Sequence, residues 1–231
     1  MAGSPTRRGF LGGAATAAAV GLAGCTSGGG GKGDSDDEAG VALADHPLGE
    51  DLDRWPHLGP DPFEAPATLV VLDDPSCPTC ARFHRNTITE LESSYVADGD
   101  LALAIRPYPV VYPWGEPAAH ILEATVPRDE GVFWDLLEQY FTDQDAFNTD
   151  NVRSRSETWL EENTDLDAAA VIDDADSEPA TSRIEATLSA GEEAGAGSVT
   201  PATFAFVDGT LRTSLNGSVS TNTVETALEL G

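Results

Sequence analysis

The sequence predicts an α/β fold in which a β-α-β unit and a β-β-α unit are separated by a long helical block. Three observations lead to this prediction. An apolar, strand-like segment runs into a helix that begins at Cys77. Residues 115–195 have mainly helical patterning. Two short strand-like segments then follow, joined by Asp208-Gly209, a dipeptide typical of tight hairpins.

The first unit contains a buried strand over residues 67–72, which is apolar and partly β-branched. A helix is expected from Pro78 to about residue 97, because large apolar side chains recur at roughly helical spacing. Asp98-Gly99-Asp100 ends this helix. A second strand begins at residue 101 and continues to 105, or as far as 111. Such a β-α-β unit implies parallel strands and a right-handed crossover.

The remaining elements complete the fold. Helices are predicted over residues 117–126, 130–141, 151–162 and 177–194. Strands are predicted over residues 203–207 and 210–215, and a final helix over 221–230. This order of elements is that of a thioredoxin fold with a helical insertion at about residues 115–195.

The composition is strongly acidic, with 40 Asp and Glu against 12 Lys and Arg and a formal net charge of -28. Nucleic-acid binding is excluded as a function class, because phosphate contacts depend on Lys and Arg. The charge repels itself in dilute buffer, whereas at molar salt the screening length falls to roughly 3 Å. The acidity therefore indicates adaptation to high salt, as in extreme halophiles; the alternative is an ordinary acidic protein.

The N-terminus reads as an export signal followed by a spacer. Residues 1–24 combine paired arginines, Arg7-Arg8, with a short apolar stretch, which resembles a twin-arginine signal and not a membrane span. The small residues before Cys25 resemble a lipobox, so we expect lipidation of Cys25; the alternative is a plain cleaved signal. Residues 25–60, rich in Gly and acidic residues, are predicted to be a flexible tether. The folded domain is predicted to span 61–231.

Cys77 and Cys80 form the only cysteine pair outside the leader. Cys77 is expected at the N-cap of its helix and Pro78 at the first helical position, where proline is favourable. Unpaired N–H groups and the helix dipole then stabilise a Cys77 thiolate. Cys80 is close enough for a disulfide. A zinc site that includes His84 is the less favoured alternative, because it needs further ligands.

The segment from Cys77 to His84, Cys77-Pro78-Thr79-Cys80-Ala81-Arg82-Phe83-His84, resembles the active-site helix of the DsbA-like thiol-disulfide oxidoreductases. Asp74 and the later Val199-Thr200-Pro201-Ala202-Thr203-Phe204 are also similar to that family. The resemblance implies that Pro201 is a cis proline facing the cysteines. It also implies that Thr200 and Pro201 bind substrate, that Pro78, Thr79 and Asp74 support the active site, and that no cofactor is needed beyond the redox-active disulfide Cys77–Cys80.

The sequence departs from this family at one position. An acidic residue often stands six positions before the first cysteine, beneath the resolving cysteine, and here that position is Val71. If Cys80 must lose a proton, Asp73, Asp74, Glu64 or water must assist. We expect His84 to be a helix-face residue and not a base.

The resulting hypothesis is a lipid-anchored oxidoreductase on the outer face of the cell membrane, in keeping with a haloarchaeal protein. It would exchange disulfides with cysteine-containing exported proteins and with a membrane or extracytoplasmic redox partner, with the oxidase direction preferred. Two alternatives remain: a thiol reductase of exported proteins, and a non-catalytic lipid-anchored protein that binds a metal or a solute.

Overall fold

A computed structural model of the chain describes residues 39–231. The predicted signal peptide, the lipidation site at Cys25 and the first part of the predicted tether lie outside the described residues. No helix in residues 39–231 is long and apolar enough to span a membrane.

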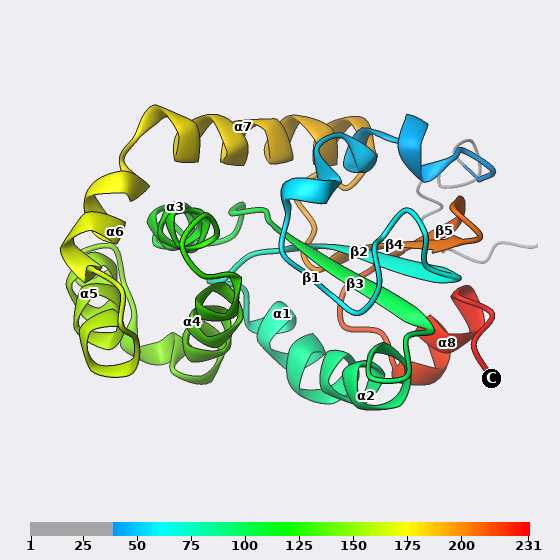
Figure 1. The fold of residues 1–231 in the computed structure, drawn as a ribbon, viewed down its shortest axis with the longest axis horizontal. Helices are drawn as coiled ribbons and strands as arrows, with labels where there is room; N and C mark the ends of the chain where they lie inside the picture. Colours follow the sequence, from blue (N-terminus) through cyan, green and yellow to red (C-terminus); the bar gives the residue numbers. More distant parts are fainter. Residues whose placement is uncertain (1–38) are drawn as a thin grey trace, which may run out of the picture. The chain divides into compact units, whose positions relative to one another are not determined.

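The centre of the fold is a five-stranded sheet with the order β1-β3-β2-β4-β5 (Figure 1). The strands are β1 (His57–Leu58), β2 (Ala67–Asp73), β3 (Leu101–Pro107), β4 (Ala202–Val207) and β5 (Thr210–Asn216). β2 is parallel to β3 and antiparallel to β4, with Leu69 opposite both Leu103 and Ala205. The predicted α/β architecture, a thioredoxin fold with a helical insertion, is therefore confirmed.

The three central strands are buried along their whole length. Such burial on both faces explains why β2 and β3 read as continuous apolar runs without polar alternation. Side chains of β2 alternate between two hydrophobic clusters. Leu69 and Val71 belong to the cluster that contains the cysteines, while Val70 and Leu72 belong to the other. In Figure 1, α1, α2 and α8 lie on one side of the sheet and α7 lies on the other.

The helix predicted from Pro78 to about residue 97 forms, but it is not a regular α-helix. α1 (Pro78–Phe83) is followed by the π-helical turn η4 (His84–Ile88), the short α2 (Thr89–Leu91) and a second π turn, η5 (Glu92–Val96). π turns inside α-helices frequently occur at functional sites. The first of them begins at His84, seven residues after the first cysteine.

The insertion between β3 and β4 is helical, as predicted. It contains α3 (Gly115–Thr125), α4 (Glu130–Thr142), the short 3-10 turn η6 (Gln144–Ala146), α5 (Val152–Asn163), α6 (Ala168–Ala175) and α7 (Glu178–Glu193). The prediction missed α6. Its signal was present in the sequence, because Asp167 caps the helix by accepting a hydrogen bond from the Ala170 N–H.

The two C-terminal elements also match their predictions. The hairpin between β4 and β5 turns at Asp208 and Gly209, both of which have positive φ, as a tight hairpin turn of this type requires. The final helix, α8 (Thr221–Ala227), begins where predicted and ends three residues earlier.

The predicted domain boundary at residue 61 is wrong. Residues 43–58 pack against the domain through the 3-10 turns η1 (Leu43–Asp45), η2 (Pro47–Gly49) and η3 (Leu52–Arg54), and through β1. Four of their side chains are buried in the hydrophobic cluster that contains Val70 and Leu72: Leu43, Leu48, Leu52 and Trp55. Their scattered spacing matches neither a helical nor a strand period, which is why the pattern resembled a tether.

Candidate active site

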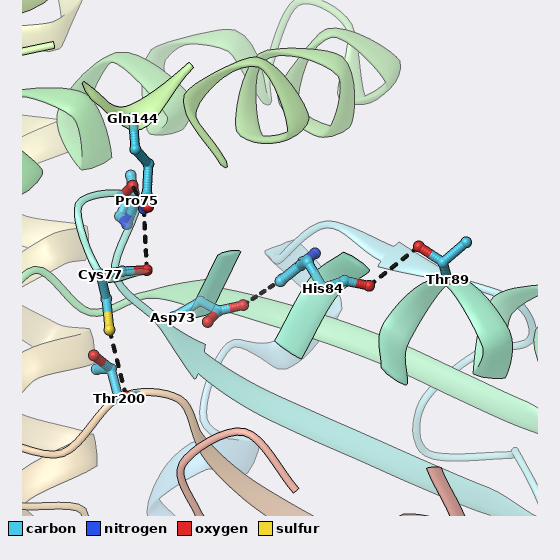
Figure 2. A network of polar contacts seen from close by, with 7 residues as sticks. All are labelled: Asp73, Pro75, Cys77, His84, Thr89, Gln144 and Thr200. Carbon is cyan, nitrogen blue, oxygen red and sulfur yellow. Dashed lines mark hydrogen bonds and ion pairs between the residues drawn. The ribbon is translucent and has the colours of Figure 1, made fainter. Parts of the chain in front are cut away.

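Cys77 lies where β2 has ended and α1 begins. It is the N-cap residue of α1, with an extended backbone (φ -81°, ψ 118°), and Pro78 occupies the first turn, as predicted. Its own N–H donates to the Asp74 carbonyl at 2.9 Å. The Gln144 side chain donates to the carbonyl oxygens of Cys77 and Pro75 at 3.0 and 2.9 Å (Figure 2). The cysteine backbone is therefore held from both the strand side and the helical insertion.

The two cysteines are free thiols in this structure and are both buried. A hydrogen bond from the Cys80 thiol is the main influence that lowers the pKa of Cys77, to about 6. Burial opposes this change, whereas contacts with the Thr200 side chain and the N–H groups of Cys80 and Thr79 reinforce it. Cys77 is thus the member of the pair that forms a thiolate more readily, and thiolate is the reactive form of cysteine.

Cys80 has the opposite environment. It has no exposed surface, and burial raises the pKa of its thiol. The hydrogen bond to Cys77 and the negative charge of the nearby Asp73 carboxylate act in the same direction. The pair is therefore asymmetric: one sulfur ionises readily and the other keeps its proton.

The loop before β4 forms a wall of the site. The Thr200–Pro201 peptide bond is cis, as the family resemblance implied. The Cys77 thiol donates to the Thr200 carbonyl oxygen at 3.5 Å (Figure 2). Val199, the residue before Thr200, is exposed. The structure thus brings together Cys77, Cys80, Thr200 and Pro201, as the sequence analysis expected.

Asp74 organises the loop that precedes Cys77. One carboxylate oxygen accepts from the Ser76 N–H and hydroxyl at 2.7 and 2.6 Å. The other accepts from the N–H groups of Val110 and Val111 at 2.8 and 2.7 Å. A Cβ at Gly115 would lie 2.5 Å from the Asp74 carboxylate, so only glycine fits beside this network. Asp74 ties the cysteine loop to the segment after β3.

Sequence reasoning missed the residues that surround the cysteine loop. A cavity of about 520 Å³ adjoins Pro78, and Tyr112, Trp114, Gln144 and Phe147 line it. Tyr112 is 52% exposed and its neighbour Val111 is 39% exposed. A signal for this grouping existed, because β2 and β3 are parallel and their carboxyl ends meet at one edge of the sheet.

Asp73 and His84 also belong to the site. The His84 ring nitrogen Nε2 lies 2.5 Å from a carboxylate oxygen of Asp73 (Figure 2). His84 therefore turns its ring inward from the helix, toward the end of β2. Among residues 39–231, no group of three or more His, Cys, Asp or Glu side chains is arranged to hold a metal ion.

A family model described as thioredoxin matches residues 58–228. The chain belongs to the thioredoxin family. No curated protein matches this thioredoxin-family chain. Solved structures do match it, and their low sequence identities make them evidence for the fold alone.

Two of these structures are DsbA proteins, and another is a BdbD. BdbD of Bacillus subtilis matches with a TM-score of 0.65 and 19% identity, over 85% of this chain and 100% of its own. Wolbachia pipientis alpha-DsbA1 matches with a TM-score of 0.63 and 18% identity, over 76% of this chain and 91% of its own. Chlamydia trachomatis DsbA matches with a TM-score of 0.62 and 18% identity, over 76% and 90% of the two chains. These likenesses support the thioredoxin-family fold with its helical insertion.

Proposed function

We propose that this protein is a thiol-disulfide oxidoreductase that acts through Cys77 and Cys80. The observation that carries the proposal is the asymmetric pair itself. Cys77 is an N-capping thiol with a pKa lowered to about 6, and Cys80 is a fully buried partner on the same turn of α1. In disulfide exchange, one sulfur of the pair forms the mixed disulfide with the substrate. The other sulfur then displaces the substrate or is itself released as a thiol.

The oxidase direction is the one we propose. A substrate thiolate attacks Cys77 of the Cys77–Cys80 disulfide, a mixed disulfide forms, and a second substrate thiol releases it. The substrate gains a disulfide and both protein cysteines become thiols. Stabilising the Cys77 thiolate favours the reduced protein, and a pair whose reduced form is stabilised is a good oxidant.

The surroundings of Cys77 fit an extended protein substrate. The Thr200 backbone beside the cis Pro201 faces the sulfur, and exposed Val111, Tyr112 and Val199 offer apolar surface in the same region. We propose that Thr200 and Pro201 contact the substrate chain, while Pro78, Thr79 and Asp74 support the cysteines. The substrates would be cysteine-containing exported proteins, and a membrane or extracytoplasmic redox partner would reoxidise the pair.

The proposed location is the outer face of the cell membrane, with Cys25 as the lipid-bearing residue after twin-arginine export. This proposal depends only on the sequence of the leader. Mass spectrometry of the protein isolated from membranes should show lipid on Cys25. An unmodified mature N-terminus at another residue would contradict it.

The catalytic proposal is tested by mixing the oxidised protein, in molar salt, with a reduced peptide that has two cysteines. We expect the peptide to become oxidised in step with reduction of Cys77 and Cys80. Cys77→Ser should abolish the reaction, and Cys80→Ser should leave no Cys77–Cys80 disulfide to donate. Full activity in both variants would contradict a role for the two cysteines, and a native protein that does not oxidise the peptide would instead support a non-catalytic binding protein. The reduction potential of the pair, measured against glutathione, decides between oxidase and reductase.

A further inference from the structure

The buried carboxylate of Asp73 has one engaged oxygen and one that is not engaged. Asp73 is the last residue of β2 and is 1% exposed. Its Oδ2 lies 2.5 Å from His84 Nε2, while within residues 39–231 its Oδ1 has no hydrogen-bond partner. Burying a carboxylate oxygen without a donor is costly. Oδ1 therefore keeps the capacity to accept a hydrogen bond or a proton.

Cys80 needs a proton acceptor, and water does not reach it directly. Its thiol has no exposed surface. The negative charge of the Asp73 carboxylate raises the pKa of this thiol, and His84, the partner of Asp73, lies one helical turn after Cys80. Asp74 is not available as the acceptor, because four donors already occupy its two oxygens. Glu64 is exposed, in the loop before β2.

His84 connects Asp73 to the surface. Its ring points toward the Asp73 carboxylate (Figure 2), and its side chain is 16% exposed. It lines a cavity of about 280 Å³ between the helix after Cys80 and α4. The ring centroid lies 4.5 Å from that of Phe141, which fixes the ring from the α4 side. One face of His84 therefore meets the buried carboxylate and another meets a cavity.

We propose that Asp73 and His84 form the route by which a proton leaves and returns to Cys80, with the cavity beside His84 as its exit to water. The inference rests on the proposed oxidoreductase function. Asp73 is the immediate proton acceptor, and His84 acts through Asp73 as a positioning and proton-transfer residue. The route does not use Val71, the strand position at which an acid would otherwise be expected.

The step in which the route operates is the displacement of a bound thiol by Cys80. When Cys77 carries a mixed disulfide with a small thiol, Cys80 transfers its proton to Asp73 and its sulfur attacks the sulfur of Cys77. The Cys80–Cys77 bond forms and the bond from Cys77 to the small thiol breaks. The departing thiolate takes a proton from water, and the proton on Asp73 leaves through His84. The protein cysteines are oxidised by two electrons and the small disulfide is reduced.

Several charged groups face this route. Asp73 and Cys77 face Cys80. Asp73 on β2, Arg85 on η4, Glu92 on η5, and Asp135 and Glu138 on α4 surround His84 or the cavity. Glu92 and His84 interact electrostatically. The rim of the cavity therefore carries three acidic side chains and one arginine.

The test follows the two steps separately. Reduced protein is mixed with excess glutathione disulfide and quenched in acid at intervals, and mass spectrometry measures the glutathione adduct on Cys77 and the final Cys77–Cys80 disulfide. The variants are Asp73→Asn and His84→Gln, which keep the size of the side chains. Asp135→Asn is the matched control, because it removes one negative charge from the same cavity rim.

We expect the adduct to form at rates within about twofold of the native protein in all variants. Its conversion to the Cys77–Cys80 disulfide should slow by about a hundredfold or more in Asp73→Asn and His84→Gln, at the lower end of typical acid–base effects, and should be unchanged in Asp135→Asn. If Asp73 acted only through its charge, Asp73→Asn should speed up this conversion, since removal of the negative charge eases ionisation of Cys80.

Unchanged or faster conversion in both variants overturns the route. Thermal unfolding checks that each variant is folded, and His84→Gln carries the test if the buried Asp73→Asn substitution is not tolerated. If the native protein forms no adduct at Cys77, the proposed oxidoreductase function fails, and not the proton route within it.

Discussion

Replacing Cys80 with alanine should raise the pKa of the Cys77 thiol from about 6 to about 7–8. The hydrogen bond that Cys80 donates is the largest influence that lowers this pKa. A hydrogen bond to a charged group contributes about 1.5–3 kcal/mol, and one pKa unit corresponds to about 1.4 kcal/mol. Loss of this donor should therefore shift the titration upward by about 1–2 units.

Cys80→Ser is the matched control, because the serine hydroxyl is a donor of similar size at the same position. The pKa of Cys77 should remain near 6 in this variant. The assay is the rate of alkylation by iodoacetamide against pH in the reduced proteins, since only the thiolate reacts. Peptide mapping separates the label on Cys77 from any label on Cys25.

Two results would refute the reasoning. A native midpoint near 8.5, the ordinary value for free cysteine, would show that the geometry does not stabilise a thiolate. Equal midpoints near 6 in Cys80→Ala and Cys80→Ser would show that the helix N–H groups and Thr200 suffice, and that the Cys80 donor is dispensable.

Three further predictions concern stability. The lowered pKa of Cys77 stabilises the reduced fold only at pH values where the thiolate forms. Relative to Cys77→Ser, we expect a free energy of unfolding higher by about 3 kcal/mol above pH 8.5 and by about 1 kcal/mol at pH 7, with no difference below pH 6. Urea unfolding of both reduced proteins across pH 5–9 measures this, and a difference that does not change with pH would contradict it. Asp74→Ala should lower the free energy of unfolding by about 3 kcal/mol or more, because four hydrogen-bond donors lose their acceptor; a loss below about 1 kcal/mol in urea unfolding would show that water replaces the carboxylate. Burial raises the pKa of Glu123 to about 7, so its contribution to stability should fall as pH rises from about 4.5 to 7, and Glu123→Gln should remove that fall; identical pH dependence of the melting temperature in the two proteins would argue against it.

Much of the fold was predictable because its strongest signals are local. The buried strand β2 is apolar throughout residues 69–72, and the hairpin after β4 carries its turn residues in the sequence. The segment 43–58 was not predictable in the same way, because it packs through isolated side chains such as Leu48 and Trp55. Its 3-10 turns have no sustained period from which burial could be inferred.

The residues of the site divide along the same line. Cys77 and Cys80 belong to one short motif and Pro201 to another. These motifs can be found in the sequence without knowledge of the fold. Gln144, by contrast, reaches the cysteine loop from a 3-10 turn in the insertion. Nothing near it in the sequence marks this contact, since it depends on how α4 ends and where the chain turns toward α5.

Asp73 and Asp74 are adjacent at the end of β2 but have different surroundings. The face of the sheet on which each side chain lies decides its contacts, and its distance from Cys77 in the sequence does not. Side chains in a strand alternate between faces, so Asp73 shares a face with Val71 and Asp74 does not. Asp73 therefore lies on the side of the sheet that meets Cys80 and His84, while Asp74 reaches the segment after β3. Asp73 stands two residues after Val71 on the same face, at the end of the strand. The alternation of the strand does not predict the partner of Asp73, because His84 comes from the following helix, where a π turn begins.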